Sequence, residues 1–103
     1  MVEELSNHGE FEKAIEKGIS IVDFFAEWCM PCVMMGPVFE EVAEKFKKFK
    51  FRKVNIEDNK DLASKYKVMS IPCIIVFKDG KEIDRIIGSV PEEVLEEKIG
   101  KLK

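Results

Sequence analysis

Two cysteines three positions apart, Cys29 and Cys32, stand between two apolar segments of different character. The segment before them, residues 19–25, is an apolar run rich in Ile, Val and Phe, which is typical of a strand buried on both faces. The segment after them, residues 33–49, carries apolar residues at helical spacing. The thiols therefore lie where a strand passes into a helix. The unpaired N–H groups and the positive dipole end of a first helical turn lower the pKa of a thiol there.

The composition predicts one globular domain over residues 1–103. Hydrophobic residues make up 46% of the chain and charged residues 36%, and this length can bury a core without disulfides. The net charge of −3 gives no basic surface for nucleic acid, and no apolar run approaches the roughly 20 residues of a membrane span. The first residues lack the basic and apolar parts of a signal peptide, which favours a cytoplasmic protein. In that compartment, close cysteines are more often catalytic or metal-binding than structural.

The rest of the chain alternates strand and helix patterns. In chain order the sequence predicts a weak edge strand over 1–5, a helix capped by Asn7 with Glu10 as its capping-box partner, the strand 19–25 and the helix 33–49. A strand over 51–56 and a short helix from Asp58 or Asn59 follow. The last elements are strands over 73–77 and 82–87, joined at Asp79-Gly80, and a helix from Pro91. Parallel crossovers come first and a hairpin follows. The predicted fold is therefore α/β, with a central mixed sheet and helices on both faces.

The segment 22–32, Val-Asp-Phe-Phe-Ala-Glu-Trp-Cys-Met-Pro-Cys, resembles the active-site signature of the thioredoxin family. A Cys-x-x-Cys close to βαβ units is an established mark of that family. The resemblance covers nearly the whole chain and extends to Pro37 in the helical segment, Lys53, Ile71-Pro72, Lys78-Asp79-Gly80 and Gly88. It implies the thioredoxin fold and the activity of a general protein-disulfide reductase.

Three positions depart from the family pattern. Met30 stands where Gly usually precedes the active-site Pro, Cys73 stands where Thr usually follows the later Pro, and Phe25 replaces the first of two tryptophans. None of these changes removes a catalytic group. Met30 and Cys73 nevertheless leave the redox potential and the range of partners open.

The resemblance assigns the chemistry to Cys29, Cys32, Asp23 and Lys53. Cys29 is the expected nucleophile, which forms a mixed disulfide with the substrate, and Cys32 then resolves it. Asp23 is expected to be buried, with a raised pKa, and to accept the proton of Cys32, while Lys53 on the next strand is its charge partner. The plainer alternatives are a structural thiol pair and a buried Asp–Lys pair kept only for structure.

The resemblance also implies a small apolar surface for partner proteins around the sulfurs. Pro72 is expected to be a cis proline facing the cysteines, which leaves the backbone of Ile71 free to pair with an extended substrate; an edge or turn proline is the alternative. The expected binding residues are Trp28, Met30, Pro31, Met69, Ser70, Ile71, Pro72, Gly88 and Ser89. Met34 and Met35 follow on the helix, which must bury at least one of them.

Cys73 and His8 are the remaining residues that could carry chemistry. Cys73 is expected close to the Cys29–Cys32 pair, as an inert buried thiol in the favoured interpretation, or as a residue that tunes the pair or joins a metal site. His8 is expected to be solvated or to cap the first helix, and it would complete a zinc site only if it converged with the cysteines. No metal or bound cofactor is expected, because the dithiol itself carries the chemistry.

The expected partners are disulfide-containing proteins and a thioredoxin reductase that supplies electrons, with no nucleic-acid or membrane partner and a monomeric protein. Two alternatives stay open. The first is a protein-disulfide oxidant or isomerase, or a glutaredoxin-like enzyme fed by glutathione, which Met30 allows. The second is a metal-binding or scaffold module that uses Cys73.

Overall fold

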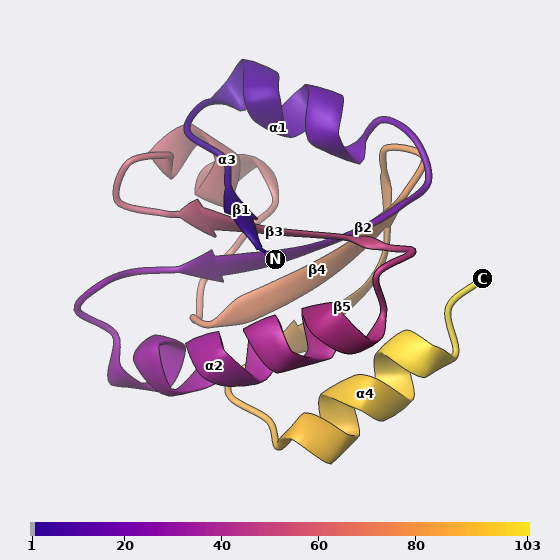
Figure 1. The fold of residues 1–103 in the computed structure, drawn as a ribbon. Coiled ribbons are helices and arrows are strands. Elements are labelled where there is room, and N and C mark those ends of the chain that lie inside the picture. Colours follow the sequence, from indigo (N-terminus) through magenta and orange to yellow (C-terminus); the bar gives the residue numbers. More distant parts are fainter. Residues whose placement is uncertain (1) are drawn as a thin grey trace.

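A computed structural model describes residues 2–103 as a five-stranded sheet with helices on both faces (Figure 1). The elements in chain order are β1 (Glu3–Glu4), α1 (His8–Ile15), β2 (Ile19–Phe25), α2 (Met30–Lys45), β3 (Lys50–Asn55), α3 (Lys60–Lys65), β4 (Cys73–Lys78), β5 (Lys81–Ile87) and α4 (Glu92–Gly100). This order is the predicted one, and it confirms the α/β class. Met1, part of the predicted first strand, lies outside the described residues.

The strands lie in the order β1-β3-β2-β4-β5, so β2 occupies the centre of the sheet. β1 and β2 run parallel to β3, whereas β4 runs antiparallel to both of its neighbours. The register sets Asp23 of β2 directly beside Lys53 of β3. Paired residues on neighbouring strands point to the same face, so these two side chains share one side of the sheet.

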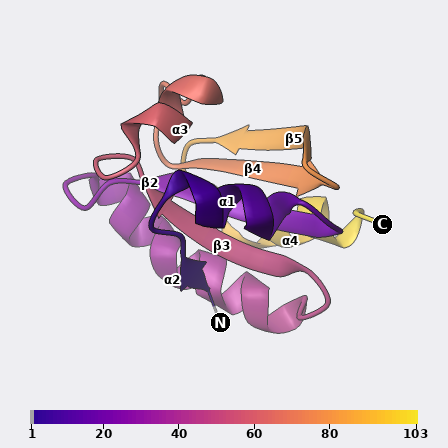
Figure 2. The ribbon, with the colours of Figure 1, turned by 90° about the horizontal axis from the view of Figure 1, so that it is seen from above.

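Helices α1 and α3 cover one face of the sheet, and α2 and α4 cover the other (Figure 1). Seen from above, α1 lies in front of the strands, with α2 and α4 behind them (Figure 2). Strand residues alternate between the faces, so Ile21 belongs to the core beneath α2 and α4, and Val22 to the core beneath α1 and α3. No helix within residues 2–103 is long and apolar enough to cross a membrane.

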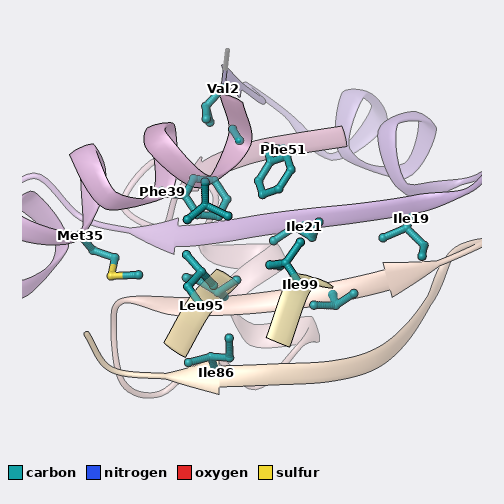
Figure 3. Packing of buried hydrophobic residues seen from close by; sticks show 13 residues of the cluster. Val2, Ile19, Ile21, Met35, Phe39, Phe51, Ile86, Leu95 and Ile99 are labelled. Atoms are coloured by element: carbon teal, nitrogen blue, oxygen red, sulfur yellow. The ribbon is translucent and has the colours of Figure 1, made fainter. Parts of the chain in front are cut away.

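Each face of the sheet has its own apolar core. On the α2 and α4 face, Phe39, Leu95 and Ile99 pack with residues of the strands (Figure 3). The core on the opposite face is rich in aromatic rings, contributed by Phe11, Phe24, Tyr66 and Phe77. Both faces of the central strand β2 are therefore covered by packed apolar side chains.

The main difference from the sequence prediction concerns the bounds of α2. The helix begins at Met30, with Cys29 as its N-cap residue, which agrees with the predicted position of the cysteines. It ends at Lys45 rather than at residue 49, because Phe46 leaves the helical conformation at φ −126° and ψ 59°. The rings of Phe46 and Phe49 then stack with centroids 6.5 Å apart and pack against the core. Phe46 and Phe49, although at helical spacing in the sequence, therefore pack from a turn and not from a helix.

The short-range signals at the other element ends are largely confirmed. Asn7 caps α1 by accepting the Glu10 N–H at 2.9 Å, although the Glu10 carboxylate accepts the Ser6 N–H instead of closing the expected capping box on Asn7. Asp79 and Gly80 have φ values of 50° and 87°, as a two-residue hairpin turn of this type requires. α3 follows Asn59, one of its two predicted starting residues, although the Asn59 side chain makes no capping hydrogen bond. α4 begins at Glu92, one residue after the predicted Pro91.

Truncation of Leu95 tests how α4 is seated on the sheet. Leu95 is fully buried, whereas the adjacent Val94 is 39% exposed. We expect Leu95→Ala to lower the free energy of unfolding by about 2–5 kcal/mol, because the loss of apolar contacts leaves a cavity. Val94→Ala is the matched control, with an expected change within about 1 kcal/mol. Urea unfolding measures both, and equal effects would contradict this orientation of α4.

Candidate active site

The two cysteines lie at the N-terminal end of α2, just after the loop that follows β2. Cys29 is the N-cap residue, Cys32 lies in the first turn, and the two form a disulfide. Cys29 Sγ accepts the backbone N–H of Cys32 at 3.2 Å. When the disulfide is reduced, this N–H and the positive end of the helix dipole favour a thiolate on Cys29.

The loop over residues 67–72 meets the disulfide. Its Ile71–Pro72 peptide bond is cis, as the resemblance implies. The Ile71 carbonyl oxygen lies 3.8 Å from Cys29 Sγ, and the Ile71 side chain packs against the small cluster of Ala26, Cys29 and Cys32. The Pro72 carbonyl accepts the N–H of Gly88 at 2.8 Å, so the residue after β5 is tied to the same loop.

Large exposed side chains stand next to the cysteines along the chain and on the loop 67–72 that meets them. Trp28 is 67% exposed, Met30 66% and Met69 93%, which is unusual for large apolar side chains. Of the other residues expected here, Pro31, Ser70 and Ser89 are exposed, Ile71 and Gly88 are partly buried, and Pro72 is buried. Apart from the buried Pro72, the set is at least partly exposed, and its large exposed side chains are apolar.

Val33 was not among the binding residues expected from the sequence, although its side chain is 52% exposed. Met34 is 66% exposed and Met35 is fully buried, so the expectation that at least one of the two methionines packs in the core is confirmed. Met30, Val33 and Met34 follow the i, i+3, i+4 spacing of one helix face. That spacing was visible in the sequence and could have identified the exposed face of α2.

A hollow of about 230 Å³ opens beside Cys32. It is lined by Asp23, Phe25, Ala26, Glu27, Cys32, Val33, Gly36 and Lys53. The expected site residues Asp23, Cys32 and Lys53 therefore share one space. Glu27 and Gly36 were not singled out from the sequence, and only their places in the loop and on α2 bring them here.

Asp23 is 4% exposed, and its Oδ1 has no hydrogen-bond partner among residues 2–103. Burial raises the pKa of its carboxyl from 3.8 to about 7, and the positive charge of Lys53 opposes that rise. Lys53 Nζ also lies 5.8 Å from the centre of the Phe25 ring, a cation–π contact. A buried carboxyl with a pKa near neutrality can gain or lose a proton under ordinary conditions.

Cys73 lies on the other side of the sheet from α2. The alternation along β4 sends its thiol into the core beneath α1 and α3, together with residues such as Phe24. From the sequence, Cys73 was expected close to the disulfide. A strand that is apolar on both faces, as residues 73–77 are, gives no sign of which way each residue points. Burial raises the pKa of the Cys73 thiol, with an opposing effect from Arg85, whose Nη1 lies 4.0 Å away. These surroundings are those of an unreactive thiol.

His8 is the first residue of α1, and its ring lies between two carboxylates. Nδ1 is 3.0 Å from Asp61 Oδ2, and Nε2 is 3.4 Å from Glu12 Oε2. The cysteines lie elsewhere, so His8 does not converge with them. Across residues 2–103 there is no group of three or more His, Cys, Asp and Glu side chains that could hold a metal ion.

Comparison with known proteins gives a consistent assignment. The Thioredoxin family model matches residues 2–101. A thioredoxin of Staphylococcus aureus is 44% identical over 93 residues, which cover 89% of each chain. Among solved structures, thioredoxin of Plasmodium falciparum superposes with a TM-score of 0.92 at 31% identity, over 99% of this chain and 100% of that one. Thioredoxin of Fasciola hepatica gives a TM-score of 0.91 at 38% identity, with the same coverage.

The match spans both cores and the whole site, not just the two cysteines. The expected thioredoxin fold is therefore confirmed, and with it the expected class of chemistry. The Cys29–Cys32 disulfide supplies the redox pair that such chemistry requires. The chain belongs to the thioredoxin family and is a thiol–disulfide oxidoreductase of the disulfide-reductase type.

Proposed function

We propose that this reductase acts on protein disulfides, with Cys29 as the nucleophile and Cys32 as the resolving thiol. The observation that carries the proposal is the position of Cys29 as N-cap of α2, where the Cys32 N–H reaches its sulfur at 3.2 Å. Both residues are 5% exposed, so little of either cysteine is accessible to a substrate disulfide. The helix terminus favours a thiolate on Cys29, which is the form that attacks.

The reaction has two exchanges. The Cys29 thiolate attacks one sulfur of the substrate disulfide, so a Cys29–substrate S–S bond forms and the other substrate sulfur leaves as a thiolate that takes up a proton. The Cys32 thiolate then attacks Cys29 Sγ, the Cys29–Cys32 bond forms, and the second substrate sulfur leaves and is protonated. The substrate gains two electrons and two protons, and the pair loses them. A reductase protein restores the dithiol.

Asp23 is proposed to accept the proton of Cys32 before the second exchange. Its carboxyl shares the hollow with Cys32, is nearly fully buried, and has a pKa raised to about 7. Such a group is a proton acceptor matched to neutral conditions. Lys53, on the same face of the sheet, lowers the cost of the negative charge that Asp23 then carries.

Substrate proteins are proposed to bind the exposed apolar surface with an extended segment beside Ile71. Pro72 has no N–H of its own, and the exposed methionines offer adaptable contacts to varied partners. The binding residues are those expected from the sequence, Trp28, Met30, Pro31, Met69, Ser70, Ile71, Pro72, Gly88 and Ser89, with Val33 and Met34 added. We further propose a single domain that works as a monomer in the cytoplasm, with a thioredoxin reductase as electron donor.

Trapping experiments with single-cysteine changes test these roles. Cys32→Ser should accumulate a mixed disulfide through Cys29 when it is incubated with insulin whose disulfides are intact, because the resolving thiol is missing. Cys29→Ser should neither reduce insulin nor form that adduct. Non-reducing gels and mass spectrometry measure the adduct and its site.

Cys73→Ala is the control for these variants, since its thiol lies in the core on the opposite face. We expect it to keep native turnover. Adduct formation at Cys73, or full insulin reduction by Cys29→Ser, would overturn the assigned roles.

The midpoint potential of the pair separates a reductase from an oxidant or isomerase, the alternative that Met30 allows. On a scale where thioredoxins themselves stand at about −270 mV and isomerases at about −180 mV, we expect the reducing end. Equilibration in defined thiol–disulfide buffers, followed by the fluorescence of Trp28 beside Cys29, gives the value. A midpoint potential near that of isomerases would indicate that the pair oxidises or isomerises protein disulfides, which would contradict the proposed reductase.

Asp23→Asn should stabilise the oxidised protein in a pH-dependent way. The unfolded carboxyl loses its proton near its ordinary pKa of 3.8, whereas the native one keeps it up to about pH 7. Raising the pH through this window therefore favours the unfolded state of the native sequence, by roughly 2–4 kcal/mol in total, and the asparagine variant lacks this loss. Urea unfolding at several pH values should show the two proteins diverging from pH 4 to pH 7 and running parallel above.

Glu41→Gln, which neutralises an exposed carboxylate on α2, serves as the control and should show no such divergence. The same asparagine variant should resolve mixed disulfides more slowly near neutral pH, because Cys32 has lost its proton acceptor. A pH-independent stability difference would mean that Asp23 does not hold a proton near neutrality.

A further inference from the structure

Arg85 of β5 reaches across to the end of α3. Its partner in the register of β4 is Ile75, a residue of the core beneath α1 and α3, so its side chain lies on that face. Its Nη2 donates to the Tyr66 carbonyl at 2.7 Å, and its Nη1 lies 3.4 Å from the Lys67 carbonyl. Both carbonyls belong to the stretch of chain that enters the loop 67–72.

These carbonyls lie where a helix leaves its acceptors unpaired. α3 ends at Lys65, and Lys67 turns the chain with a φ of +53°, which lets the Val68 N–H bond back to Ala63 at 2.8 Å. The carbonyls of Tyr66 and Lys67 then point toward β5. A cation at a helix C-terminus is favoured by the dipole, and a guanidinium offers donors in a fixed plane.

Two further contacts fix the guanidinium itself. Glu82 receives a two-pronged ion pair, from Nε at 2.7 Å and from Nη2 at 2.8 Å. The remaining Nη1 hydrogen faces Cys73 Sγ at 4.0 Å, a weak acceptor. Arg85 is therefore held at one end by β5 and contacts both flanks of the loop, since Lys67 opens it and Cys73 directly follows Pro72.

We propose that Arg85 is a positioning residue, which holds the loop 67–72 in the geometry that a protein substrate needs at the disulfide. It touches neither sulfur and acts through the loop, whose Ile71 carbonyl lies 3.8 Å from Cys29 Sγ. The inference rests on the proposed function, in which an extended substrate segment lies beside Ile71. A loop that shifts by a fraction of an ångström misaligns that segment with the attacking sulfur.

The proposal separates two kinds of substrate. A protein disulfide uses the loop as a binding edge, whereas a small disulfide such as hydroxyethyl disulfide needs only access to Cys29. Loss of Arg85 should therefore weaken protein binding and leave the reaction of the sulfurs intact. A residue needed only for stability would affect both substrates alike or neither.

The test uses Arg85→Met, Arg85→Lys and the control Lys45→Met. Lys45 also pairs with two carboxylates, Glu92 and Glu96, but on the face of α2 and α4, so its loss removes the same charge away from the loop. For Arg85→Met we expect KM for insulin to rise about tenfold, with kcat and the rate on hydroxyethyl disulfide within about twofold of native. Arg85→Lys keeps the positive charge but lacks the planar set of guanidinium donors, so its KM for insulin should lie between those of the native protein and Arg85→Met.

Amide hydrogen exchange gives the structural readout. Arg85→Met should exchange about tenfold faster at the Val68 N–H, which bonds to the Ala63 carbonyl, and at the Gly88 N–H, which bonds to the Pro72 carbonyl, with the core of β2 and β4 unchanged. Should Arg85→Met fail to fold, Arg85→Lys carries the same comparison. An unchanged KM for insulin, or an equal loss on both disulfides, would overturn the proposal. Failure of the native protein to reduce insulin would instead refute the proposed function on which it rests.

Discussion

The site depends on a sulfur that is held at the start of a firmly packed helix. The hydrogen bond from the Cys32 N–H to Cys29 Sγ holds it there. The helix is fixed because Met35 and Phe39 are buried against the sheet beneath it. β2, which leads to Cys29, is the central strand and is buried on both faces. A thiol on a mobile loop would not feel the helix dipole steadily, so the influence of the helix terminus on the Cys29 thiol depends on core packing.

The same central strand carries Asp23 into the interior, and this has a cost. A buried carboxyl whose Oδ1 lacks a hydrogen-bond partner within residues 2–103 does not stabilise the fold. A residue selected only for structure would be apolar at this position, as its neighbours Val22 and Phe24 are. The lost stability and the pKa of about 7 both follow from the burial of Asp23 beside the hollow that it shares with Cys32.

Much of this arrangement could be predicted from the sequence, because its signals are local. The spacing of Cys29 and Cys32 after an apolar run placed them at a helix start, and Asp79-Gly80 fixed the hairpin. The end of α2 was not predictable, since Phe46 and Phe49 keep helical spacing but pack as a turn. The direction of Cys73 was not predictable either, because a strand buried on both faces carries no alternation to read.

The contacts of Arg85 are an example of long-range interactions that local sequence signals do not predict. Its partners come from β5, β4 and the end of α3, and no sequence spacing links them. They also give a physical reason for Cys73, the departure from the family pattern that the sequence left open. A thiol is a small, weak acceptor, so it accommodates the last N–H of a guanidinium whose other donors go to Glu82 and to the carbonyls of Tyr66 and Lys67. Cys73 thus fits beside Arg85 on the face away from the disulfide, while the hydrogen bonds to Tyr66 and Lys67 are the contacts through which Arg85 reaches the loop 67–72.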